Sequence, residues 1–209
     1  MTDRMDERAL RTSEVFRGLK TIGNGERISL GDLTASLGDR GFGLLVLIFA
    51  LPNIIPMIPG VSTVSGVVIA LVGLQMMIGR HAPWMPGFVA DKTMPREQLA
   101  AMVDRTVSWV ERLEQVARPR WTGMTRGPMH VVLGAMFVLL GAILALPLSW
   151  IGNFPPGVAL VVLSIGILEE DGLLVALGHA IGIVATLLVL ALVAALVAAA
   201  LVSFGWLTA

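Results

Sequence analysis

The chain of 209 residues is 56% hydrophobic and only 14% charged. Soluble domains usually carry about 25% charged residues, so this composition excludes an ordinary soluble protein and indicates an integral membrane protein. The formal net charge is zero and cysteine is absent. These facts exclude a strongly basic surface for nucleic acid, disulfides, thiolate chemistry and cysteine-ligated metal sites.

The basic residues fall into two blocks along the chain. Seven of the 15 Lys and Arg lie from Arg4 to Arg40, and the other eight lie from Arg80 to Arg126. The positive-inside rule therefore predicts that residues 1–40 and 81–128 are both cytoplasmic.

The N-terminal segment, residues 1–40, is polar and mixes acidic with basic residues. It has no apolar stretch before a cleavage site, so we do not expect it to act as a signal peptide. The pattern predicts a short amphipathic helix at the membrane surface over residues 12–22 and a second helix, capped by Ser29, through Leu37. A surface tail with little helix is the alternative.

Residues 41–80 form the first predicted membrane hairpin. Three prolines, an asparagine and a glycine interrupt its apolar sequence over residues 50–60. Because proline lacks an amide proton and disfavours helix before it, we expect one helix to end near Pro52 and another to begin after Gly60. The first arm, about a dozen residues, covers under ~20 Å of the roughly 30 Å hydrocarbon core, which favours a re-entrant hairpin over a complete crossing.

The middle of the chain, residues 81–128, is predicted to be a cytoplasmic linker. Pro95 is expected to open an amphipathic helix, because apolar residues then recur at every third or fourth position, and Arg118 and Pro119 are expected to end it.

The second predicted hairpin covers residues 129–172. It consists of a span to Leu146, a break, and a short apolar arm from Gly157 to Leu168. The segment 173–209 is then apolar for about 35 residues, which predicts either one long tilted transmembrane helix or two segments meeting near residues 178–182.

The two hairpins share features in the same order. Ala-Leu-Pro precedes each break, Pro-Gly closes it, and two glycines six residues apart end each second arm. We therefore predict an all-α integral membrane protein built from two repeated, Pro/Gly-broken helical hairpins, with interfacial amphipathic helices and a long C-terminal transmembrane helix. Whether the repeats are parallel or inverted stays open. Matching broken segments in two halves indicate a binding site near the membrane midplane.

Several short motifs stand in order between about Ile28 and Gly178: Gly38-Asp39-Arg40-Gly41-Phe42-Gly43, Ala50-Leu51-Pro52-Asn53, Pro59-Gly60, Gln75-Met76, Gly79-Arg80, Pro83-Trp84-Met85-Pro86, Arg118-Pro119-Arg120, Gly152-Asn153-Phe154, Pro156 and Asp171-Gly172. Together they resemble the motifs of the ExoD family, named for exopolysaccharide synthesis. The resemblance implies a bacterial inner-membrane protein connected with exopolysaccharide production. It implies no catalytic mechanism. Gly157 departs from the family pattern, in which alanine is expected.

The breaks are the candidate ligand site. Helices that restart after Pro59-Gly60 and Pro156-Gly157 would present free amides that bind anions. The candidate ligand-binding residues are Pro52, Asn53, Pro56, Pro59, Gly60, Asn153, Pro156 and Gly157. The alternative is that these polar groups only satisfy the interrupted backbone.

Charged and titratable residues supply two weaker candidate sites. Glu169, Asp171 and His179 are candidates for proton or ion coupling, although a solvated acidic loop and a packed histidine are the simpler interpretations. The candidates for binding anionic headgroups at the membrane surface are Arg80, Arg118 and Arg120, and the same residues can act as topology determinants only.

These features lead to one functional hypothesis and two alternatives. We expect a homodimeric membrane protein that binds and translocates an anionic or lipid-linked solute in support of polysaccharide export, without enzyme activity, metal or cofactor. The first alternative is a non-transporting assembly or regulatory subunit for polysaccharide synthesis proteins. The second, an intramembrane enzyme, is disfavoured because no nucleophile and base stand at suggestive spacing.

Overall fold

The computed structural model describes residues 13–14, 17, 27–54, 60–84, 87–91, 93–95, 97, 100, 111, 117, 120–121, 124–125, 127–146 and 150–208. Most of the linker helix predicted between Pro95 and Arg118 therefore lies outside the described residues. Ser13, Glu14 and Arg17 are helical, and the rest of the predicted helix over residues 12–22 is also outside them.

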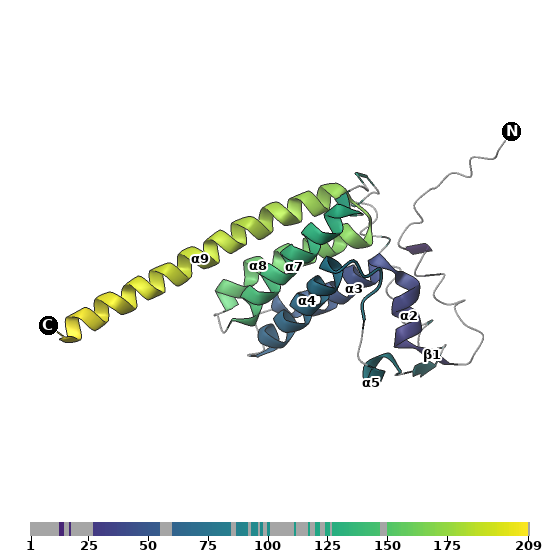
Figure 1. Cartoon of the computed structure of the whole chain (residues 1–209), viewed down its shortest axis with the longest axis horizontal. Helices are drawn as coiled ribbons and strands as arrows, with labels where there is room; N and C mark the ends of the chain where they lie inside the picture. Colours follow the sequence, from purple (N-terminus) through teal and green to yellow (C-terminus); the bar gives the residue numbers. More distant parts are fainter. Residues whose placement is uncertain are drawn as a thin grey trace.

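Two antiparallel helical hairpins form the centre of the molecule (Figure 1). The first consists of α3 (Asp39–Ala50), the short 3-10 helix η2 (Leu51–Asn53) and α4 (Val61–Met77). The second consists of α7 (Pro128–Ala145) and α8 (Trp150–Leu168). The hairpins pack so that α3 lies along α8 and α4 lies along α7, and α9 (Gly172–Thr208) lies along α8.

One apolar core runs through this bundle and receives side chains from every long helix. Its largest fully buried side chains are Phe42, Val46, Ile69, Met76, Leu133, Phe137, Leu140, Leu144, Leu160, Leu163 and Val175. The bundle also exposes large apolar side chains on its outer surface, among them Ile48, Val64, Leu71, Val132 and Leu139. A helix bundle that is apolar outside as well as inside is typical of a protein surrounded by lipid.

Glycines let α4 and α7 approach closely. A Cβ added to Gly73 would lie 2.5 Å from the Gly134 carbonyl oxygen, and one added to Gly66 would lie 2.5 Å from the Gly141 carbonyl oxygen. These distances leave no room for any side chain, so the two helices pack backbone to backbone, as small-residue interfaces do in membranes.

A small subassembly joins the N-terminal segment to the linker. Strand β1 (Arg27–Ser29) pairs antiparallel with β2 (Thr93–Pro95), and the short helices α2 (Leu30–Leu37) and α5 (Gly87–Ala90) pack together beside them. The Ser29 hydroxyl accepts a hydrogen bond from the Asp32 amide, which confirms the predicted cap of α2. Pro95 ends β2, so its predicted place at the first position of a helix is wrong.

The second hairpin differs from its predicted form. The short arm was expected to begin at Gly157, but α8 begins at Trp150 and continues through Pro155 and Pro156 to Leu168. Pro155 and Pro156 are the sixth and seventh residues of α8, beyond the first four amides that lack partners in any helix, so the helix continues through them with two backbone hydrogen bonds missing. The break thus ends before Trp150, and the first hairpin alone restarts at its predicted glycine, Gly60.

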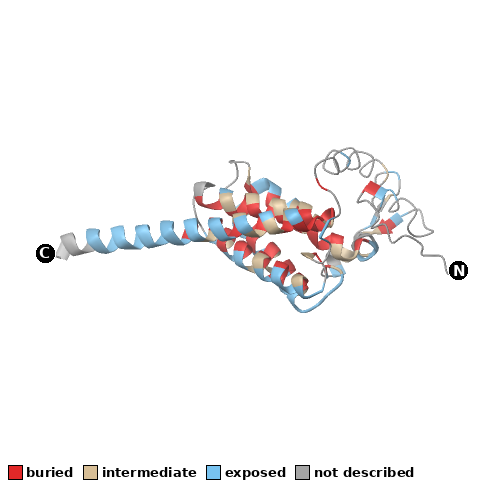
Figure 2. Cartoon of the chain, turned by 90° about the horizontal axis from the view of Figure 1, so that it is seen from above, coloured by how far each residue is buried: buried red, intermediate tan, exposed pale blue. Residues whose placement is uncertain are grey.

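The C-terminal apolar run is a single helix, which excludes the two-segment alternative. In α9, residues 172–189 contact the bundle and bury side chains as far as Val189, whereas residues 190–203 are all exposed. Figure 2 shows this second part, here called the α9 extension (residues 190–208), projecting beyond the bundle.

Among the described residues, two helices are long and apolar enough to cross a membrane, Pro128–Ala145 and Gly172–Ser203. The apolar helices Val61–Met77 and Gly152–Leu168 are slightly shorter. The chain is therefore predominantly helical, with lengths and composition that suggest association with a membrane.

Candidate functional site

The first break meets the first turns of α8 in the structure. Asn53, in η2, is only 3% exposed, and its Nδ2 donates a hydrogen bond of 2.7 Å to the Phe49 carbonyl. A Cβ added to Gly157 would lie 3.4 Å from the Asn53 Cβ, which is ordinary contact distance. The first break, at η2, therefore packs directly against the first turns of α8.

Asn153 lies one helical turn before Gly157, on the same face of α8, and is also 3% exposed. The Oδ1 atoms of Asn53 and Asn153 are both enclosed, and neither has a hydrogen-bond partner among the described residues. We call this group, Asn53, Asn153, Gly157 and the adjoining first turns of α8, the elbow site.

Of the two helix starts predicted to bind anions, only the one after Gly60 occurs in the structure. Gly60 has φ +89° and precedes α4, whose first amides lack a side-chain cap. Pro156 and Gly157 instead lie inside α8, so no helix starts there and that part of the prediction is wrong. Pro52 lies in η2 beside Asn53, while Pro56 and Pro59 lie outside the described residues.

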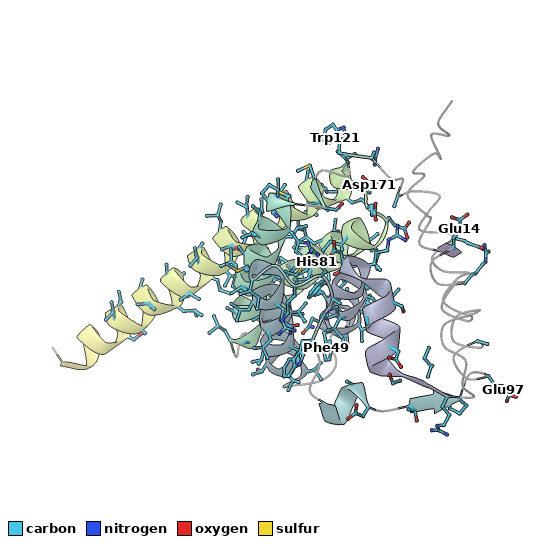
Figure 3. The ribbon with its side chains drawn as sticks, turned by 45° about the vertical axis from the view of Figure 1, so that its right-hand side comes forward. Glu14, Phe49, His81, Glu97, Trp121 and Asp171 are labelled. Carbon is cyan, nitrogen blue, oxygen red and sulfur yellow. The ribbon has the colours of Figure 1, made fainter. Side chains whose placement is uncertain are left out.

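The opposite end of the bundle carries buried charges. The Asp171 side chain is fully buried, and Arg120 Nε donates to both of its carboxylate oxygens at 2.9 and 3.1 Å. The same carboxylate accepts hydrogen bonds from the Leu173 and Leu174 amides, so it caps α9. Figure 3 shows Asp171 beside Trp121 and well apart from Phe49, next to the elbow site.

A second ion pair lies next to the first. Arg40, at the start of α3, is 3.3 Å from the Glu170 carboxylate, and both side chains are nearly buried. Glu169 is 3% exposed. The simpler interpretation of residues 169–171 as a solvated acidic loop is therefore wrong, because these carboxylates are enclosed among helix ends and arginines.

Of the other predicted residues, Arg80 and His179 lie apart from this group, whereas Arg120 belongs to it. Arg120 is engaged by Asp171 rather than directed only at the membrane surface, Arg80 is exposed, and Arg118 lies outside the described residues. His179 is eight residues beyond Asp171, roughly 12 Å along α9, and its Nδ1 lies 2.8 Å from the Val175 carbonyl oxygen. The histidine is packed within its own helix, as the simpler interpretation held.

Sequence reasoning missed Arg40 and His130. His130 is 8% exposed in the first turn of α7 and packs edge to face on Phe42 of α3, with ring centroids 5.7 Å apart. Arg40 pairs with a residue 130 positions away, and the one signal available was that both blocks of arginine had to lie at one membrane side. No group of three metal-ligating side chains occurs in the part of the chain that the structure describes.

Comparisons with known proteins agree with the motifs. Residues 12–191 match the family model described as "Exopolysaccharide synthesis, ExoD". The chain is 36% identical to Protein ExoD of Rhizobium meliloti (strain 1021) over 171 residues, which cover 80% of this chain and 71% of that protein. It is 30% identical to an uncharacterized protein of Synechocystis over 156 residues, covering 74% and 73%. No solved structure matches. The chain therefore belongs to the ExoD family of exopolysaccharide synthesis proteins.

Proposed function

We propose that this protein is a multi-pass inner-membrane protein that supports exopolysaccharide synthesis by binding, and moving across the membrane, a lipid-linked or small solute at the elbow site. The observation that carries the proposal is the contact between the first break, at η2, and the first turns of α8, with two enclosed asparagine oxygens that no described residue satisfies. Interrupted backbone and unsatisfied polar groups inside an apolar bundle usually mark a place where a ligand or water enters.

The lengths of α4, α7 and α8 favour complete crossings over re-entrant hairpins, whereas α3, with 12 residues or about 18 Å, is the short arm that the sequence indicated. At roughly 1.5 Å per residue, α4, α7 and α8 measure about 26, 27 and 28 Å, close to the roughly 30 Å hydrocarbon core. Arg40 lies at the start of α3, Arg80 follows the end of α4, and Arg120 precedes α7. All three therefore lie near the same end of the bundle. We propose that this end faces the cytoplasm and that the elbow site lies near the opposite membrane surface.

The packing also supports an internal duplication with parallel repeats. In a duplication, α3 would correspond to α7 and α4 to α8. The contact of α3 with α8 would then correspond to the contact of α7 with α4, and the structure contains both contacts. Both hairpins open at the same end, where Arg40 of the first pairs with Glu170, which follows the second.

A homodimer would cover the α9 extension. The whole of α9 measures about 56 Å at roughly 1.5 Å per residue, almost twice the hydrocarbon thickness, and its exposed half carries no charge. We propose that the extension packs against a second copy. A Val193→Cys variant in membranes should then form a disulfide-linked dimer on mild oxidation, and Leu139→Cys, on an outer face of α7, should not.

Complementation tests the elbow site in cells. In a strain that lacks the protein, we expect Asn53→Leu, Asn153→Leu and Pro52→Ala to reach wild-type levels in the membrane but to restore little exopolysaccharide. Thr186→Val is the control, because the Thr186 hydroxyl is satisfied within α9 by the Gly182 carbonyl at 2.8 Å.

The same experiment separates the transport proposal from its alternative. If all three elbow variants restore exopolysaccharide fully, the elbow site has no role, and an assembly or regulatory subunit acting through the linker is favoured. The proposed mechanism involves binding and movement only, without covalent chemistry or a cofactor.

A further inference from the structure

We infer that the elbow site accepts hydrogen bonds from hydroxyl groups, so that its ligand is a neutral polyhydroxylated headgroup, such as a glycosyl group, carried on an apolar chain. This inference rests on the proposed function, because it assigns the chemical class of the solute that the elbow site binds. It replaces the anion that free helix amides would favour with a ligand that donates hydrogen bonds.

The orientation of the Asn53 amide is fixed by its own helix. Its Nδ2 donates to the Phe49 carbonyl, and a carbonyl can only accept, so the nitrogen must face Phe49. The Oδ1 atom therefore faces away from that bond and stays enclosed without a partner among the described residues. Rotation of the amide would break the bond to Phe49, so Asn53 presents an acceptor to the site.

The first turns of α8 supply further acceptors. The Asn153 Oδ1 is enclosed and unsatisfied in the described part of the chain. Pro155 and Pro156 have no amide proton, so the Ile151 and Gly152 carbonyls cannot receive the hydrogen bond that a helix normally supplies from four residues ahead. Two enclosed asparagine oxygens, and two backbone carbonyls that lack their usual helical donor, thus lie in the first turn of α8 and the adjoining η2.

This excess of acceptors discriminates between ligand classes. Carboxylate and phosphate oxygens only accept, and they would face oxygens of like partial charge. Metal ions such as Ca²⁺ prefer six to eight oxygen ligands including carboxylates, and the described elbow-site residues include no acidic side chain. Hydroxyl groups donate to such oxygens without bringing a charge into an apolar bundle, where an isolated charge is costly.

Exposed apolar side chains next to the site suit the lipid chain of such a ligand. Leu51, beside Asn53 in η2, is 47% exposed, and Phe154, beside Asn153 in α8, is 38% exposed. Both come from the two elements that form the elbow site, so an amphiphile bound there can place its chain along the outside of the bundle.

Direct binding to the purified full-length protein tests the inference. The protein is extracted without glycoside detergents and held in phosphatidylcholine nanodiscs. The probes are radiolabelled dodecyl maltoside, as a neutral glycosyl amphiphile, and dodecyl phosphate, as an anion with the same chain. We expect saturable binding of dodecyl maltoside, about tenfold weaker in Asn53→Leu and in Asn153→Leu, as loss of one hydrogen bond predicts. Thr186→Val should bind as the wild type does.

A stability measurement shows whether the variants fold. Leucine is close to asparagine in size and removes an unsatisfied buried oxygen, so each Leu variant should melt at or above the wild-type temperature without ligand. Dodecyl maltoside should raise the melting temperature of the wild type and of Thr186→Val, and it should raise that of the Leu variants much less.

Each other outcome contradicts a defined part of the argument. If dodecyl phosphate binds better and depends on the asparagines, the inference of a hydroxyl donor is wrong while the proposed solute site stands. If dodecyl maltoside binds equally to all variants, the asparagines do not recognise it and the inference is overturned. If neither probe binds saturably, the inference also fails, and full complementation by the Leu variants would then remove the proposed function as well.

Discussion

At the scale of single residues, Asp171 has two structural roles at once. Its buried carboxylate pairs with Arg120, whose side chain is 45% exposed, and it accepts two amide hydrogen bonds at the start of α9. The cap joins α8 to α9, and the ion pair holds the end of the linker against both helices. A short polar side chain before a glycine was visible in the sequence, but its partner 51 positions earlier was not.

Two substitutions separate these roles. Asp171→Ala removes both and should destabilise the folded protein by about 2–3 kcal/mol, below the full cost of breaking a buried pair because Arg120 is partly solvated. Asp171→Asn keeps the cap, since asparagine caps helices as well as aspartate does, and should cost about 1 kcal/mol. Thermal unfolding in detergent measures both variants. Equal losses for the two would show that the cap contributes nothing.

At the scale of elements, the contact between α4 and α7 depends on the absence of side chains. Gly73→Ala would place a methyl group 2.5 Å from the Gly134 carbonyl oxygen and 2.8 Å from the Val138 amide nitrogen, both of them backbone atoms. The helices must separate to accept it, which should cost about 2–3 kcal/mol as overpacking does. A lower melting temperature in detergent is the expected result.

Gly182→Ala provides the matched control on α9. The added methyl group would meet the Met136 sulfur at 3.0 Å, and that flexible side chain can move aside. We expect its melting temperature to stay close to that of the wild type. If Gly73→Ala is tolerated equally well, the backbone contact between α4 and α7 does not hold the hairpins together.

The elements also show what the sequence could predict. The stop near Pro52, the restart after Gly60 and the cap of α2 were predictable because each depends on residues within a few positions. The start of α8 at Trp150 was not, because proline near a helix start and proline at a break have the same local signature. The pairs Arg40–Glu170 and Asn53–Gly157 depend on how the hairpins pack, which no local pattern encodes.

At the scale of the whole molecule, two lengths must fit one membrane. Three bundle helices, α4, α7 and α8, are nearly as long as the hydrocarbon core is thick, whereas α9 is about twice as long. In a bilayer, α9 must either tilt strongly or gain a partner for the extension, since an apolar helix does not stay in water. The depth of the elbow site in the membrane decides how much of α9 remains outside the lipid.

Variants with a single introduced cysteine can locate the elbow site relative to the membrane, because the chain has no cysteine of its own. His81 and Trp121 are exposed near the charged end, Leu146 is exposed just after α7, and Leu139 is exposed on the middle of α7. With a membrane-impermeant maleimide, we expect Leu146→Cys to react in intact spheroplasts, and His81→Cys and Trp121→Cys only in inverted vesicles. Leu139→Cys, facing lipid, should react in neither preparation.

The labelling result distinguishes membrane-spanning from re-entrant hairpins, because α7 is about 27 Å long between its two ends. Labelling of Leu146→Cys from outside requires that α7 crosses the hydrocarbon core completely. If that position is protected in spheroplasts and in inverted vesicles, as Leu139→Cys is, the hairpins are re-entrant and the elbow site lies within the bilayer. A ligand would then reach the elbow site from the lipid alone. Translocation would require η2 and the first turns of α8, which form that site, to move.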